Sequence, residues 1–140
     1  FHMQISCYTE HPERHHALLT EGVTFKTLYE VLRESDIINV SVPLTGKTKN
    51  LISSEKIACI KPTAVFIHTS RAGVVDIEAL IHKADRYPCF YVGLDIDMDG
   101  YEELFAHYRK NVIVTPHIAG ISKPALERMG EELANYIVHF

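Results

Sequence analysis

Short apolar stretches rich in β-branched residues alternate along the chain with segments of helical periodicity. The apolar stretches predict strands at Met3–Tyr8, Ile37–Val42, Ala64–His68, Phe90–Leu94 and Val112–Val114. Alternation of this kind is typical of an α/β fold, in which helices cover both faces of a parallel sheet. Because Ala64–His68 carries few charges, we expect this strand to be buried on both faces.

Capping residues and spacing predict the helices. Thr27 and Glu30 form a capping-box pattern, and Ser53 and Asp76 are suitable N-caps, the first for a short helix that ends near Cys59. Two further helices are predicted at Glu102–Tyr108 and from Pro124 towards Phe140. The apolar face of the last helix consists of Leu126, Met129, Leu133 and Ile137. The segment between the first strand and Thr27 is interpreted as a polar loop.

Composition and charge argue against several classes of protein. A net charge of −4 provides no basic surface for nucleic acid or an anionic membrane. No apolar run approaches the roughly 20 residues of a membrane span, and no signal-peptide pattern opens the chain. The three cysteines are widely spaced, and the histidines near His11 are interpreted as a solvated helix start, so neither a disulfide framework nor a metal site is predicted. We expect a cytoplasmic protein.

Charged or ionisable residues follow three of the predicted strands. Arg71 comes shortly after Ala64–His68, Asp95 follows Phe90–Leu94, and His117 follows Val112–Val114. Ligands of open α/β sheets bind outside the carboxyl ends of the strands, where these side chains are expected to converge. Each residue alone is more often an ion pair, a turn residue or a structural histidine, so the prediction of a site depends on their joint placement.

This combination suits hydride transfer to a 2-keto acid. An arginine grips the carboxylate of the substrate with two parallel hydrogen bonds. A histidine has a suitable pKa to protonate the developing alkoxide, and a carboxylate beside it stabilises the imidazolium. A nicotinamide cofactor supplies the redox chemistry.

Five ordered stretches resemble the D-isomer-specific 2-hydroxyacid dehydrogenase family: 35–45, 60–64, 68–76, 93–95 and 111–120. The resemblance implies a Rossmann-like, doubly wound parallel sheet and an NAD- or NADP-dependent enzyme. It further implies a small 2-hydroxy or 2-keto acid as substrate, and a homodimer. Neither nucleic acid nor a membrane is expected as a partner.

The resemblance also implies roles for individual residues. Arg71 corresponds to the substrate-binding arginine, His117 to the acid/base histidine, and Asp95 to the aspartate near the nicotinamide carboxamide. The residues that it places at the cofactor are Thr9, Val42, Pro43, Thr69, Ser70, Arg71, Asp95, His117, Ala119 and Gly120.

The chain departs from the family in three places. The glycine-rich phosphate loop is absent, so the fold is expected to lack its first strand and the following helix, and both ends of the chain look cut. Thr9 stands where an acidic residue usually contacts the adenosine ribose, which leaves NAD and NADP open. Gly100 stands in place of the catalytic glutamate. Glu102 and Asp99 are the candidates for its role, and Asp97 is a further carboxylate nearby.

We therefore expect residues 1–121 to form a partial dinucleotide-binding domain, and residues 122–140 to form a helix leading toward an absent substrate domain. The chain alone is expected to be inactive, as a fragment of an active dehydrogenase. Two alternatives stay open: a non-catalytic NAD-sensing or corepressor-like protein, which Gly100 favours, and a degenerate gene remnant. A glycine-rich loop encoded in frame upstream of Phe1 would indicate a cut enzyme.

Overall fold

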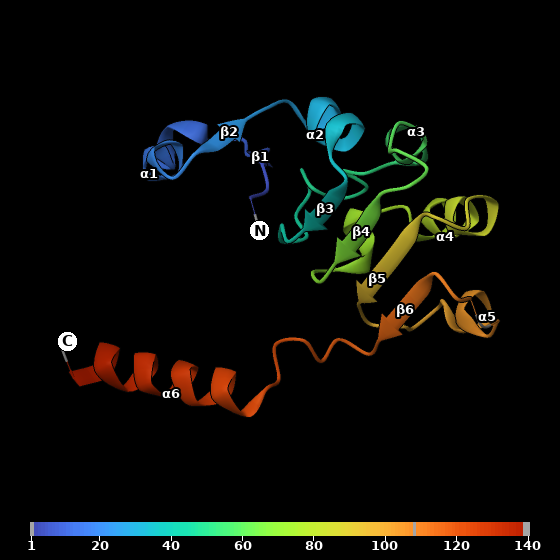
Figure 1. The fold of residues 1–140 in the computed structure, drawn as a ribbon. Coiled ribbons are helices and arrows are strands. Elements are labelled where there is room, and N and C mark those ends of the chain that lie inside the picture. The colour runs from blue at the N-terminus through green and yellow to red at the C-terminus, as the bar shows by residue number, and fades with distance from the viewer. Residues whose placement is uncertain (1, 108, 139–140) are drawn as a thin grey trace.

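A computed structural model describes residues 2–107 and 109–138, and its main body is a four-stranded parallel sheet (Figure 1). The strand order is β3-β4-β5-β6, with all neighbours parallel. The strands span β3 (Ile37–Val40), β4 (Val65–His68), β5 (Tyr91–Asp95) and β6 (Val112–Thr115). The α/β class and four of the predicted strands are thereby confirmed.

The helices begin where their capping residues predict. In α2 (Leu28–Glu34) the capping box is complete: the Glu30 N–H donates to Thr27 Oγ1, and the Thr27 N–H donates to Glu30 Oε2. The N–H of Ala79 donates to Asp76 at the start of α4 (Ile77–Arg86). Ser53 precedes α3 (Ser54–Ala58), as predicted, but its side chain makes no capping hydrogen bond.

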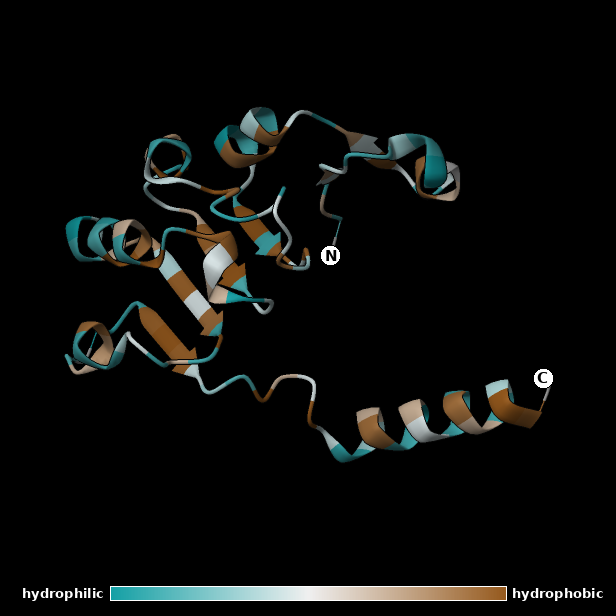
Figure 2. Ribbon diagram, turned by 180° about the vertical axis from the view of Figure 1, so that it is seen from behind, coloured by the Kyte–Doolittle hydropathy of each residue, from teal (hydrophilic) through white to brown (hydrophobic). Residues whose placement is uncertain are grey.

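The two C-terminal helices are also present. The short helix α5 spans Glu102–Phe105, so it ends earlier than predicted, and Tyr108 lies outside the described residues. The last helix, α6 (Lys123–Val138), extends away from the sheet (Figure 1). Its apolar stripe is visible along the helix in Figure 2, and Leu126, Met129 and Leu133 on it are all more than half exposed. The predicted end at Phe140 lies outside the described residues.

One face of the four-stranded sheet carries the core. Ile38, Phe66, Val92 and Leu94 are buried on it, against Leu80 of α4 among others. The opposite face is open: Ile37, Tyr91 and Ile113 are between 51% and 70% exposed. The prediction that Ala64–His68 is buried on both faces is therefore wrong, since Val65 and Ile67 are only half-buried.

The prediction of a polar loop before Thr27 is wrong, because this segment forms regular secondary structure. It contains a short 3-10 helix (Pro12–Arg14), α1 (His16–Thr20) and β2 (Val23–Phe25). The strand β2 pairs in parallel with β1 (Ile5–Cys7) in a separate two-stranded sheet. In place of the expected single sheet of about five strands, residues 2–107 and 109–138 form two parallel sheets with six strands in total.

A groove of about 990 Å³ lies between the two sheets and runs along both β1 and β3. Both strands have a neighbour on one side only, so their other edges carry unpaired backbone groups. The groove thus lies between two strand edges that have no partner strand among the described residues.

Two further features belong to the described part of the chain. All three cysteines there are free thiols. No helix among residues 2–107 and 109–138 has the length and apolar character to cross a bilayer.

Candidate active site

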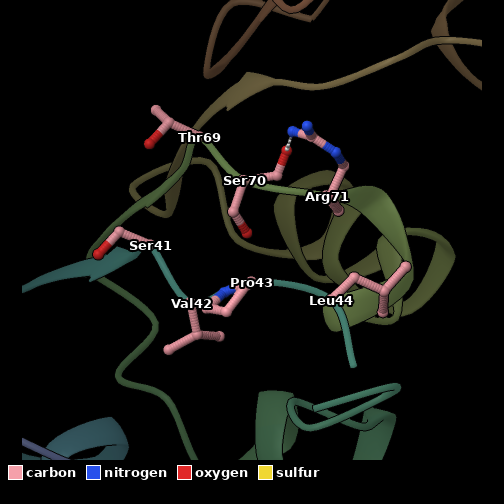
Figure 3. Close-up of a pocket in the computed structure, with 7 residues that line it drawn as sticks. All are labelled: Ser41, Val42, Pro43, Leu44, Thr69, Ser70 and Arg71. Atoms are coloured by element: carbon pink, nitrogen blue, oxygen red, sulfur yellow. Dashed lines mark hydrogen bonds between the residues drawn. The ribbon is translucent and has the colours of Figure 1, made fainter. Parts of the chain in front are cut away.

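Parallel register brings the carboxyl ends of β3 to β6 into one row. Val40 pairs with His68, His68 with Leu94, and Leu94 with Val114, so the residues that follow these positions share one edge of the sheet. A pocket of about 600 Å³ opens at this edge (Figure 3). It is lined by Ser41, Val42, Pro43, Leu44, Thr69, Ser70 and Arg71. The structure therefore brings together five of the residues predicted at the cofactor, and adds Ser41 and Leu44.

Ser70 presents an unsatisfied polar atom in this pocket. Its Oγ is buried and has no hydrogen-bond partner among the described residues. Figure 3 shows the side chain directed toward Val42 and Pro43, across the pocket. A buried hydroxyl without a partner costs roughly 1–3 kcal/mol, so this atom fits a ligand that offers a hydrogen-bonding group here.

Arg71 and His117 meet although they are far apart in the chain. Nη1 of Arg71 donates to Nε2 of His117 over 2.8 Å. A guanidinium has no acceptor, so Nε2 presents its lone pair and the ring proton lies on Nδ1. The Nδ1 atom lies 3.2 Å from Oδ1 of Asp97. The edge thus holds a guanidinium, an imidazole and a carboxylate in contact.

The backbone of His117 has an uncommon conformation. Its φ is 52°, in the left-handed region, and its N–H donates to the carbonyl of Thr115 at 2.9 Å. Non-glycine residues in this region concentrate at functional sites, where the surrounding structure holds them. The tight turn after β6 directs the imidazole back toward Arg71.

Asp95 holds the loop that carries His117. Its carboxylate accepts hydrogen bonds from the Ile118 N–H at 2.8 Å, the Ala119 N–H at 2.9 Å and the Thr115 hydroxyl. Burial by itself raises the pKa of Asp95, but these hydrogen bonds outweigh it and hold the pKa below its usual value. A charged Asp95 at neutral pH therefore anchors the loop, a contact that the sequence did not predict.

His68 is a second contributor that the sequence did not single out. It is fully buried at the end of β4, with Nε2 3.1 Å from the Arg71 carbonyl and Nδ1 3.4 Å from the Val40 carbonyl. A neutral ring has one N–H and donates to only one of these two carbonyls, and the Arg71 carbonyl is the nearer of the two. The position of a histidine directly before Thr69-Ser70-Arg71 was the available signal.

We expect His68 to make stability depend on pH. Burial lowers the pKa of His68, although hydrogen bonds to Val40 and Arg71 partly oppose this. The unfolded chain, in which histidine has a pKa of about 6.5, then binds the proton more readily. The free energy of unfolding is therefore highest above about pH 6.5 and falls on acidification toward about pH 5.

Urea unfolding of the chain across this pH range measures the effect. In the His68→Asn variant, an amide that does not titrate replaces the ring, and the loss on acidification should shrink. The exposed His82→Asn variant is the matched control and should keep the dependence of the parent chain. An identical pH dependence in His68→Asn and the parent would contradict the assignment.

Other predicted site residues lie elsewhere. Asp99 and Glu102 are exposed, and among the described residues neither forms a hydrogen bond or ion pair with His117. The carboxylate that contacts His117 in this structure is Asp97. Ala119 contributes its N–H to Asp95, and Gly120 follows it in the same loop.

Thr9 lies in the loop after β1, outside the pocket that Arg71 lines. Its Oγ1 accepts from the His11 N–H at 3.3 Å. The neighbouring Glu10 lies 3.5 Å from Lys47, so an ion pair joins this loop to the one after β3. Within the described residues, no cluster of three or more His, Cys, Asp or Glu side chains could hold a metal ion.

Comparisons with known proteins find dehydrogenases that are similar to this chain in sequence and in fold. A glyoxylate reductase of Thermococcus litoralis is 39% identical over the whole chain, which spans 42% of that relative's length. A peroxisomal glycerate dehydrogenase of Arabidopsis thaliana is 37% identical over 78% of the chain and 29% of its own length. The D-lactate dehydrogenase of Aquifex aeolicus, solved with NAD and lactic acid, superposes with a TM-score of 0.71 at 29% identity. That match covers 96% of this chain and 45% of the solved one.

A family model also matches most of the chain. The family model described as "D-isomer specific 2-hydroxyacid dehydrogenase, NAD binding domain" matches residues 1–119. The resemblance stated from the five sequence stretches is thereby confirmed, and so is the Rossmann-like fold. The chain belongs to the D-isomer specific 2-hydroxyacid dehydrogenase family, and the match lies in that family's NAD-binding domain.

Proposed function

We propose that this chain is the dinucleotide-binding part of an enzyme that transfers a hydride between NAD(P) and a small D-2-hydroxy acid or its 2-keto acid. The observation that carries the proposal is the contact between Arg71 and His117, 2.8 Å apart at the carboxyl edge of the sheet. A carboxylate-binding cation beside a proton-transferring imidazole is the pair that this reaction needs. The relatives named as glyoxylate reductase and glycerate dehydrogenase support the substrate class.

The roles follow from the chemistry of the side chains. The guanidinium of Arg71 binds the carboxylate of the substrate, and His117 exchanges a proton with the oxygen on C2 through Nε2. Asp95 keeps the His117 loop in place by accepting three hydrogen bonds. Arg71 has to exchange its hydrogen bond to Nε2 for the substrate, because both need the same atom of His117.

The pocket at Val42, Pro43, Thr69 and Ser70 suits the nicotinamide end of a dinucleotide. When bound, the nicotinamide supplies or accepts the hydride. The buried, unpaired Oγ of Ser70 offers one hydrogen bond to this group. Thr9 and its loop are assigned to the adenosine end, where the hydroxyl of Thr9 gives no charge that would exclude a 2′-phosphate.

The proposal also covers the domain organisation, the oligomeric state and the cellular location of the whole protein. Residues 1–121 form a partial dinucleotide-binding domain, and residues 122–140 lead to a substrate domain. The protein acts as a homodimer in the cytoplasm, without nucleic acid or a membrane as partner. Apolar residues are exposed on α6 and on the open face of the sheet, which supports the proposal that further protein surface packs against them.

We expect the 140-residue chain to bind NADH at least tenfold more weakly than the full-length protein. The backbone N–H groups of a glycine-rich loop, which bind the pyrophosphate, are absent from this sequence. Calorimetric titration of both proteins with NADH and NADPH measures the difference. Equal micromolar affinity of the two would show that the pocket at Ser70 and Arg71 suffices for binding.

A second candidate is a non-catalytic NAD-sensing or corepressor-like protein, which Gly100 favours because it replaces the expected glutamate. Steady-state assays separate the two. The full-length protein is given NADH or NADPH with glyoxylate, hydroxypyruvate or pyruvate, and loss of the reduced cofactor is followed. Turnover with at least one keto acid supports the enzyme; dinucleotide binding without turnover on any of them supports the sensor.

A further inference from the structure

The carboxylate in contact with His117 comes from the turn directly after β5. Asp97 Oδ1 lies 3.2 Å from Nδ1, and the side chain of His117 is 27% exposed while that of Asp97 is 68% exposed. Gly100, three residues further on, has a φ of 85° and stands where the family resemblance predicts a glutamate. The carboxylate that contacts His117 therefore lies three residues closer to β5 than the position where a glutamate was predicted.

We infer that Asp97 is the positioning residue of His117, and that it directs proton exchange to Nε2. The inference rests on the role proposed for His117. Because the guanidinium of Arg71 only donates, Nε2 carries the lone pair and the proton on Nδ1 faces Asp97. The ring is thereby held from both sides, with the reactive nitrogen turned toward the position of the substrate.

Three charged groups face His117 from neighbouring elements, and they act differently. Arg71, after β4, disfavours a second positive charge on the ring, whereas Asp97, after β5, favours it. Asp95, at the end of β5, also carries negative charge, but its carboxylate oxygens already accept hydrogen bonds from the Thr115 hydroxyl and from two loop N–H groups. Once a substrate carboxylate neutralises Arg71, Asp97 is the group that stabilises a protonated His117.

This assignment predicts a shift in the pH profile of the full-length enzyme. The pH at which keto-acid reduction falls to half its maximum should move down by about half a pH unit in Asp97→Asn, the size expected for an exposed pair. Turnover should fall more than KM rises, because the carboxylate does not contact the substrate. Asp97→Glu keeps the charge and should restore most of the profile, while NADH affinity and circular dichroism report that each variant is folded.

Two matched variants test whether the effect belongs to this position. Asp99→Asn and Glu102→Gln remove carboxylates of the same connection that do not contact His117, and both should keep the parental profile. A shift in either of these, with none in Asp97→Asn, would overturn the inference. If Asp97→Asn fails to fold, Asp97→Ser takes its place in the comparison.

Nuclear magnetic resonance of protein labelled with ¹⁵N-histidine separates this inference from the proposed function. It follows protonation of the His117 ring in the absence of turnover. A lower midpoint in Asp97→Asn than in the parent supports the pairing even in a protein without reductase activity. An unchanged midpoint overturns the pairing whatever the activity.

Discussion

Replacing His117 by alanine should lower the turnover of the full-length enzyme by roughly 10²–10⁴-fold, the usual contribution of general acid–base catalysis. The alanine has no group at the position of Nε2, so the alkoxide that forms at C2 has to take its proton from water. Binding of NADH should survive, because the hydroxyl of Ser70 and the backbone around Pro43 are unchanged. Steady-state assays with the accepted keto acid measure the effect.

The control for this substitution is His82→Ala, an exposed position on α4 away from the edge of the sheet. It should keep the turnover of the parent enzyme. Turnover of His117→Ala within threefold of the parent would remove His117 from the reaction and leave the pocket as a binding site only.

Replacing Arg71 by lysine should raise KM for the keto acid roughly 10- to 100-fold, which corresponds to the 1.5–3 kcal/mol of hydrogen bonds to a charged group. An ammonium is a point charge and cannot reproduce the planar, two-point grip of a guanidinium on a carboxylate. The loss of the 2.8 Å contact with Nε2 of His117 does not add to this effect, because the substrate displaces that contact in the parent enzyme as well.

Substrate-saturation curves for the parent, Arg71→Lys and the exposed control Arg33→Lys measure this difference. The control should match the parent in KM and turnover. If Arg71→Lys lowers turnover at an unchanged KM, Arg71 acts on the transition state rather than on the bound carboxylate, and its assigned role is wrong.

Local signals in the sequence predicted much of this fold. The pair Thr27 and Glu30 and the cap Asp76 marked helix starts that the structure reproduces. The strand β2 was missed because its three residues, Val23–Phe25, are too few to show a periodicity. The open face of the sheet could not be read from β4 alone, since burial depends on the helices that pack against it.

The sequence predicted those site residues that follow the ends of strands. Arg71 and His117 were placed at one edge by the rule for parallel sheets, and the structure brings them into contact. The contact of Asp97 with His117 was not predicted, because spacing along the chain does not give the path of a turn. That path brings Asp97 to the imidazole. The anchoring bonds of Asp95 and the burial of His68 likewise depend on backbone groups that the sequence pattern does not locate.

The most direct test of the account is the fate of the hydride. The full-length protein is incubated with NADH or NADPH carrying deuterium at C4 of the nicotinamide, in turn on each face, together with pyruvate, glyoxylate or hydroxypyruvate. We expect deuterium on C2 of the hydroxy acid, a D-configured product where C2 is a stereocentre, and transfer that is slower by roughly 10²–10⁴-fold in His117→Ala. A full-length protein that binds the cofactor but leaves deuterium on the nicotinamide with every keto acid would contradict it.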